Sequence, residues 1–295
     1  MLNQSVVGSP KGSPGGEPLA SKPCVPFLKW AGGKRWLTAS HPHIFPPEFD
    51  RYVEPFLGSA AVFFHLQPAS ALLSDSNVDL INVYQEIQRN WAKVQKALHR
   101  HHARHTSKYY YIERSRSRRA AHELAAQFLY LNRTCWNGLY RVNLKGEFNV
   151  PKGTKSSVIL DTDNFEQVSR VLKNADLRAS DFEPIINSTN ENDFVFIDPP
   201  YVTRHNLNGF LKYNEKIFTW SDQVRLAKAI ERASKRGAKI LLTNANHSSV
   251  RLLYRDLAAR HTMLSLSRSS VLAADAAQRG AVTELVLAIN YRPTR

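Results

Sequence analysis

The feature that most constrains this chain is a short apolar run that ends in an acid, two prolines and an aromatic residue. Residues 193–201 read Asp-Phe-Val-Phe-Ile-Asp-Pro-Pro-Tyr. The four consecutive apolar residues at 194–197 predict a strand buried on both faces, which is typical of a mostly parallel sheet. Ligands of open α/β sheets bind beyond the carboxyl ends of the strands, so residues 198–201 are expected to face a ligand.

The residue types at 198–201 suit a flat ring that carries an exocyclic amine. An ionised carboxylate only accepts hydrogen bonds, and the two prolines lack N–H donors, which leaves backbone carbonyls free to accept. The tyrosine adds an aromatic face. The structural alternative is a strand followed by a proline-rich turn, with the tyrosine as a packing residue. The candidate catalytic residues are Asp198, Pro199, Pro200 and Tyr201.

Strand and helix patterns alternate around this run. Helices are expected to open at Ala60 and near Val78, and Ser221 is expected to cap a helix whose apolar face holds residues 224, 227, 230 and 233. The alternation predicts an α/β fold in which a mostly parallel sheet is covered on both faces. Strands are expected at 52–54, 71–75, 194–197, 239–243 and 284–289.

The middle of the chain is strongly basic. Residues 93–119 contain nine Lys and Arg and a single acid, Glu113, in a chain whose formal net charge is +15. This density favours an anionic partner, and a solvated face is the alternative. A helix with apolar residues at 128, 129 and 131 follows, and strand-like residues 147–150 predict a hairpin or looped ribbon after it.

Composition also limits the compartment and the metal chemistry. Two cysteines, Cys24 and Cys135, exclude a disulfide framework or a four-cysteine zinc site. No apolar stretch approaches the ~20 residues that cross a bilayer, and no secretory signal is expected. His101 and His105 are expected on a solvated or phosphate-facing helix, because no acid accompanies them as in a zinc protease motif. We therefore expect a cytoplasmic protein with no metal and no membrane association.

Two small-residue turns lie upstream of residues 198–201. Gly32 and Gly33 precede Lys34, and residues 56–60, which read Phe-Leu-Gly-Ser-Ala, follow the first expected strand. Small residues in a turn let the backbone approach a ligand closely. Asp75 ends the second expected strand, where an acid is placed to accept from ribose hydroxyls. Each turn alone is weak support for a binding site.

In this order and spacing, these segments resemble the Dam-like, D12 class N6-adenine DNA methyltransferases. The resemblance runs from about residue 27 to residue 291, and residues 130–141 are similar to the DNA-reading segment of that family. It implies a Rossmann-like S-adenosylmethionine-dependent methyltransferase sheet with an inserted helical plus β-hairpin DNA-recognition domain. The implied organisation is a flexible tail at 1–26, a first catalytic part at 27–90, the inserted domain at 91–165 and a second catalytic part at 166–295.

The resemblance also implies a cofactor and a set of binding residues. The cofactor is S-adenosyl-L-methionine, and its product is S-adenosyl-L-homocysteine. A tryptophan face beside a sulfonium is physically reasonable, since an aromatic face attracts a cation by roughly 0.5–2 kcal/mol. Residues expected to bind the cofactor are Trp30, Gly32, Gly33, Lys34, Phe56, Gly58, Asp75 and Asp198. Residues expected to bind DNA are Trp136, Asn137, Leu139 and Arg141.

Two departures from the family pattern are present. Ser59 and Ala60 stand where many relatives carry another glycine, and residues 152–155 read Lys-Gly-Thr-Lys where relatives often have aromatic, Arg or Tyr residues. The implied activity is methylation of adenine N6 in duplex DNA after base flipping, within GATC, by a bacterial or phage-type enzyme that acts as a monomer or weak dimer on DNA. The alternatives are a DNA-binding protein on a methyltransferase scaffold, or methylation of another amine such as one in RNA.

Overall fold

The computed structural model describes residues 24–143, 145–202, 218–269 and 281–294. Its centre is a seven-stranded sheet in the order β3-β2-β1-β4-β5-β7-β6. The first five strands in this order run parallel, whereas β7 is antiparallel to both β5 and β6, so the expected α/β sheet is confirmed. The strands are β1 Tyr52–Glu54, β2 Ala71–Asp75, β3 Ala175–Ala179, β4 Phe194–Ile197, β5 Lys239–Ala245, β6 Thr262–Ser269 and β7 Ala281–Ile289.

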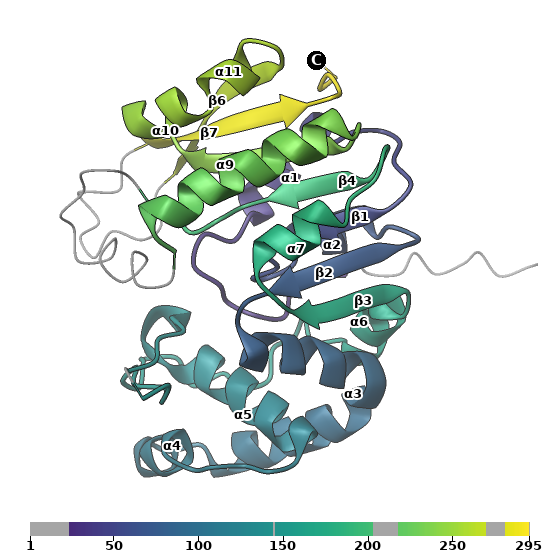
Figure 1. Cartoon of the computed structure of the whole chain (residues 1–295). Coiled ribbons are helices and arrows are strands. Elements are labelled where there is room, and N and C mark those ends of the chain that lie inside the picture. The colour runs from purple at the N-terminus through teal and green to yellow at the C-terminus, as the bar shows by residue number, and fades with distance from the viewer. Residues whose placement is uncertain (1–23, 144, 203–217, 270–280, 295) are drawn as a thin grey trace, which may run out of the picture.

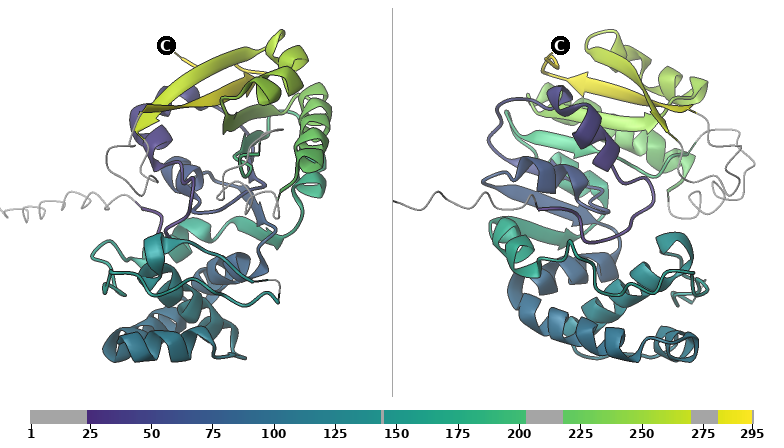
Figure 2. Two further views of the ribbon diagram at one scale, coloured as in Figure 1. Left: turned by 90° about the vertical axis from the view of Figure 1, so that its left-hand side faces the viewer. Right: turned by 180° about the vertical axis from the view of Figure 1, so that it is seen from behind.

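Helices cover both faces of this sheet. Figures 1 and 2 show α7 and α9 on one face and α1 and α2 on the other. The strand β4 alternates between the two cores: Phe194 and Phe196 pack in the first, and Val195 and Ile197 in the second. The expectation that this strand is buried on both faces is therefore confirmed. The sheet-covering and C-terminal helices are α1 Arg35–Ser40, η1 Pro42–Ile44, α2 Ala61–Leu66, α7 Phe182–Asn187, α9 Trp220–Lys235, α10 Ser248–Leu253 and α11 Arg255–Ala258.

A helical lobe lies beyond the β3 edge of the sheet (Figure 1). The long helix α3 starts directly after β2 and is interrupted at Asn90, whose backbone angles are φ −136° and ψ 30°. No helix within the described ranges is long and apolar enough to span a membrane. The helices of the lobe are α3 Val78–Arg104, α4 Ser107–Arg114, α5 Ala121–Thr134, η2 Trp136–Gly138 and α6 Phe165–Leu172.

The predicted start and apolar face of α9 were partly wrong. Thr219, not Ser221, is the N-cap: its side chain accepts from the backbone of Asp222, and the Asp222 carboxylate accepts from the backbone N–H of Thr219. This reciprocal capping box satisfies two helix-end donors, which a serine at position 221 would not. The buried face is also rotated, because Leu226 and Ala229 are buried while residues 224 and 227 are only half-buried.

Two predictions about the segments around the lobe need correction, and a third is partly confirmed. Most of the expected tail lies outside the described residues, but Cys24, inside its 1–26 boundary, is buried in the main core. Residues 147–150 form no regular strand, but they fold back as a looped ribbon: an antiparallel bridge joins Val142 to Phe148, and the Asn149 N–H donates to the Arg141 carbonyl at 3.1 Å. His101 is buried rather than solvated, because it stacks on Tyr130 with ring centroids 4.9 Å apart.

Candidate active site at the carboxyl ends of the parallel strands

A cavity of about 830 Å³ opens where β1, β2, β3 and β4 end. Its volume lies in the range of sites that bind small molecules. Segments far apart in the chain meet here, because the carboxyl ends of parallel strands share one edge of the sheet. All the residues expected to act in catalysis or cofactor binding line this one cavity: Trp30, Gly32, Gly33, Lys34, Phe56, Gly58, Asp75, Asp198, Pro199, Pro200 and Tyr201.

The residues expected to bind DNA divide into two pairs. Leu139 and Arg141 line the same cavity, whereas Trp136 and Asn137 lie outside it. Trp136 is 51 % exposed, and Asn137 adopts a left-handed backbone with φ 55°. The Arg141 guanidinium is oriented by the side chain of Asn149, which accepts from Nε at 2.8 Å. This loop therefore runs from the cavity outward to the surface.

Both oxygens of the Asp198 carboxylate have partners. The Thr243 hydroxyl donates to Oδ1 at 2.7 Å, and the Lys34 ammonium lies 2.8 Å from Oδ2. Lys34 also donates to the carbonyl of Gly32 at 2.8 Å, so the glycine turn and Asp198 share one cation. Burial raises the pKa of Asp198, while Lys34 and the Thr243 hydrogen bond oppose that shift.

A buried acid that the sequence analysis did not single out lies behind Tyr201. The Tyr201 hydroxyl donates to Glu284 Oε2 at 2.7 Å, and Arg268 Nε donates to the other oxygen. The Lys34 ammonium lies 3.6 Å from the same Oε2. The only sequence signal for Glu284 was its position directly before the apolar run 285–289.

Trp30 and Gly58 form one closely fitted wall of the cavity. Gly58 has φ +46°, and a Cβ on it would lie 2.7 Å from Trp30 Cδ1. The indole joins a cluster of three near-parallel rings, with centroids 5.9 Å from Tyr140 at 25° and 6.4 Å from Phe128 at 18°, and those two rings lie 5.1 Å apart. This turn therefore needs glycine both for its left-handed backbone and for the approach of the indole.

Two further carboxyls line the cavity at the ends of β1 and β2. Asp75 accepts from the backbone N–H groups of Gly58 at 3.1 Å and Asn77 at 2.9 Å. Glu54 accepts from the Tyr52 hydroxyl at 2.9 Å. Burial raises the pKa of Asp75 and raises that of Glu54 well above its ordinary range. Glu54 ends the expected strand 52–54 and was not predicted as a site residue.

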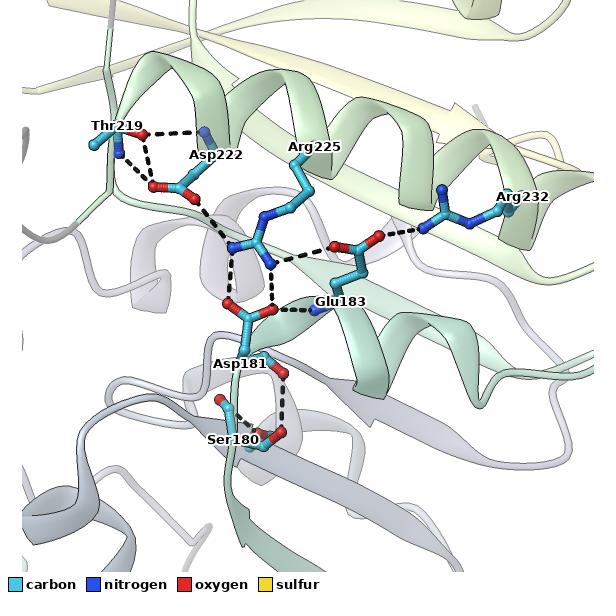
Figure 3. Close-up of polar contacts among 8 residues, drawn as sticks. Ser180, Asp181, Glu183, Thr219, Asp222, Arg225 and Arg232 are labelled. Atoms are coloured by element: carbon cyan, nitrogen blue, oxygen red, sulfur yellow. Dashed lines mark hydrogen bonds and ion pairs between the residues drawn. The ribbon is translucent and has the colours of Figure 1, made fainter.

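The wall beyond β3 is held by an arginine clamp that was not predicted (Figure 3). Arg225 binds both oxygens of Asp181 at 2.8 Å and also binds Asp222 at 3.0 Å. Its guanidinium lies 4.3 Å from the centroid of Phe182, which in turn stacks on Phe56 at 5.3 Å. The clamp connects α9 to the end of β3 beside the cavity.

These groups together suit two flat ligands side by side. Aromatic and backbone-rich walls surround the Trp30–Gly58 end, and the acid and carbonyls of residues 198–200 lie at the β4 end. In the described part of the chain, no group of three or more His, Cys, Asp or Glu residues is placed to hold a metal ion.

Comparison with known proteins identifies the family. A sequence model described as D12 class N6 adenine-specific DNA methyltransferase matches residues 30–267. The type II methyltransferase M1.LlaDCHI of Lactococcus lactis subsp. cremoris is 33% identical over 276 residues, which are 90% of this chain and 95% of the relative. The DNA adenine methylase of Haemophilus influenzae is 31% identical over 237 residues, 78% of this chain and 82% of the relative. The chain therefore belongs to the D12 class of N6 adenine-specific DNA methyltransferases.

Proposed function

We propose that this protein transfers the methyl group of S-adenosyl-L-methionine to N6 of an adenine that is flipped out of duplex DNA, within GATC. The observation that supports this most is the cavity at the strand ends. It is lined by the acid of the tetrapeptide at 198–201, by the expected cofactor residues and by two expected base-reading residues, Leu139 and Arg141. The GATC site is proposed from the resemblance of the whole chain, residues 130–141 included, to Dam-like enzymes.

The residues around Trp30 fit the cofactor. S-adenosylmethionine supplies an electrophilic methyl group on a sulfonium. The stacked indole of Trp30 offers an electron-rich face to such a cation. Asp75 has its backbone bonds in place and retains lone pairs for ribose hydroxyls. Gly32, Gly33 and Gly58 keep the backbone close to the ligand, and Lys34 and Phe56 complete the pocket.

Asp198 and the carbonyl of Pro199 are the proposed acceptors for the two N6 hydrogens. Adenine N6 is a poor nucleophile because its lone pair is delocalised into the ring. Two acceptors in fixed positions localise that lone pair and stabilise the positive charge that develops on nitrogen. The Thr243 and Lys34 contacts fix the carboxylate, and Tyr201 stacks on the base. Alignment of this kind supplies several kcal/mol, up to ~7–11 in ideal systems.

The inserted segment at 91–165 is the proposed DNA-binding part. A base inside a duplex must be flipped out, which costs a few kcal/mol, and phosphate contacts stabilise the deformed DNA. Three of the nine basic residues at 93–119, namely Arg100, Arg116 and Arg118, pair with Glu113 or Glu123. The proposed phosphate contacts are the exposed residues Lys93, Lys96, Arg104, Lys108 and Arg119. Base reading is proposed for Trp136, Asn137, Leu139 and Arg141.

The test is to supply labelled cofactor with unmethylated plasmid DNA, total RNA or protein in separate reactions. The proposal expects label in duplex DNA, recovered as N6-methyladenine after digestion to nucleosides and concentrated in GATC. Label in RNA or protein alone overturns it. Plasmid binding without label supports the alternative of a DNA-binding protein on a methyltransferase scaffold.

A further inference from the structure

Glu284 is a buried carboxylate directly behind the wall of the cavity. It lies on β7, opposite Ala245 of β5, and is 1 % exposed. It is not itself a lining residue, but its three polar partners, Lys34, Tyr201 and Arg268, all line the cavity. Glu284 belongs neither to the tetrapeptide at 198–201 nor to the glycine turns, so neither motif predicts a buried acid here.

The charges around Glu284 balance. Lys34 and Arg268 are two cations, and Asp198 and Glu284 are the two carboxylates that they contact. An arginine stays charged in proteins, and the Nε–H of Arg268 donates to a Glu284 oxygen. Without Glu284, the same wall would carry two cations and one carboxylate beside a ligand that is itself cationic.

We propose that Glu284 is the counter-charge and positioning residue of this site: it keeps the wall neutral for the sulfonium and for the charge that develops on N6, and it fixes the ring of Tyr201. The inference rests on the proposed function, since it assumes a sulfonium cofactor in the cavity. Electrostatic interaction falls only as the inverse of distance and is little screened in a buried site, so Glu284 acts without touching the ligand. Arg268 acts in the opposite direction.

The sulfonium itself provides the test. S-adenosylmethionine and S-adenosylhomocysteine share the adenosine and amino-acid groups and differ in a methyl group and a positive charge on sulfur. We expect Glu284→Gln to weaken binding of S-adenosylmethionine at least threefold more than that of S-adenosylhomocysteine. Glutamine keeps the size of the side chain and an oxygen that accepts from Tyr201. Dissociation constants from calorimetry on the full-length protein give the preference directly.

Arg268→Met is the reciprocal variant. Removing this cation leaves Glu284 less neutralised, so the preference for S-adenosylmethionine over S-adenosylhomocysteine should rise. Glu166→Gln removes an exposed acid of α6 that pairs with Arg170, and it should leave the preference unchanged. A purely structural role for Glu284 would lower the affinity for both ligands equally. Such an equal loss, or a shift of the same sign in the Glu284 and Arg268 variants, overturns the inference.

The positioning role has its own readout. In Tyr201→Phe the ring loses its bond to Glu284 while the counter-charge remains, so the ligand preference should stay at the wild-type value and kcat should fall. If the wild-type protein binds neither ligand, the proposed function fails, and this inference fails too because it rests on that function. If wild-type protein binds both and methylates DNA, but the preference does not respond to Glu284 or Arg268, only this inference fails.

Discussion

At the scale of single residues, Gly58 determines both the turn after β1 and the shape of the adjacent cavity wall. Its φ of +46° is strained for any L residue, and an added Cβ would press on the Trp30 indole at 2.7 Å. Packing against both Tyr140 and Phe128 limits how far that indole can move aside. Gly58 therefore controls the shape of the proposed cofactor pocket as well as the turn.

We expect Gly58→Ala to lose about 1–3 kcal/mol of unfolding free energy from backbone strain and to bind S-adenosylmethionine at least tenfold more weakly. Gly146→Ala is the matched control, because Gly146 also has a left-handed φ, +78°, but no atom lies within 4 Å of its added Cβ. Thermal unfolding and calorimetric titration separate the two effects. Equal loss of cofactor affinity in both variants would rule out the contact with Trp30 as the cause.

Asp198 gives a prediction for pH dependence. Burial raises its pKa, Lys34 opposes the shift, Glu284 adds to it and the Thr243 hydrogen bond lowers it. The proposed acceptor must be ionised, so the rate should fall as pH drops through a pKa above the ordinary aspartate range. Removing a group that raises this pKa moves the acidic side of the pH–rate profile, its acid limb, to lower pH. Removing a group that lowers the pKa moves the acid limb to higher pH.

We therefore expect Glu284→Gln to shift the acid limb of the single-turnover rate to lower pH and Thr243→Val to shift it to higher pH. Single-turnover measurements with saturating DNA and cofactor isolate the methyl-transfer step from binding. Shifts of the same sign in the two variants, or an acid limb that neither variant moves, would mean that a group other than Asp198 controls it.

At the scale of elements, the loop after α5 is fastened to the proposed cofactor wall. Tyr140 lies between two proposed base readers, stacks on Trp30 and Phe128, and donates to Asp79 at 3.1 Å. Asn132 of α5 adds a second link, because its amide bonds the backbone of Lys29 in both directions, at 3.0 and 2.8 Å. The segment that carries Trp30 and the proposed DNA-reading loop therefore support each other.

Tyr140→Leu tests this link. Aromatic pairs contribute about 0.5–1.5 kcal/mol beyond their burial, so we expect cofactor affinity to fall roughly two- to tenfold and discrimination against altered target sites to fall with it. Tyr111→Leu is the control, because Tyr111 is an exposed tyrosine on α4. Competition assays with cognate and single-mismatch duplexes report discrimination. A weaker cofactor site with unchanged discrimination would contradict the coupling.

Local patterns were enough to predict most elements, and long-range pairing explains what they missed. The run before Asp198 and the turn at Gly58 depend on adjacent residues, so both were predictable. Glu284 and Thr243 reach the site only through the register of β5 and β7, which no local pattern specifies. Arg225 similarly meets Asp181 only because α9 packs beside α7 (Figure 3).

Errors in the inserted segment have a related cause. Its charge density was visible, but its internal pairing was not: Glu113 is fully buried and binds Arg118. Part of the positive charge therefore stabilises the lobe rather than facing solvent. Residues 147–150 have strand-forming side chains, but their partner segment offers only one bridge, at Val142. A short extended segment does not form a regular β-ladder unless a partner strand pairs along its whole length.

At the scale of the whole molecule, the sheet and the helical lobe contribute to one cavity. The sheet supplies Asp75 and Asp198, and the segment after α5 supplies Leu139 and Arg141. Figure 2 shows the lobe beside the sheet rather than stacked on one of its faces. Among the described residues, the lobe does not cover the carboxyl ends of the strands, which suits the proposed entry of a target base at this edge.

The central claim is that Asp198, within this shared cavity, drives methyl transfer to adenine N6. The most direct measurement compares wild-type protein and Asp198→Ala for N6-methyladenine formed on unmethylated plasmid, alongside affinity for a duplex containing the target site. We predict that Asp198→Ala forms no detectable N6-methyladenine while its duplex affinity stays within about twofold of wild type, because the proposed phosphate contacts and sequence-reading residues lie elsewhere. Persistent methylation, or a loss of duplex affinity as large as the loss of rate, would contradict the account.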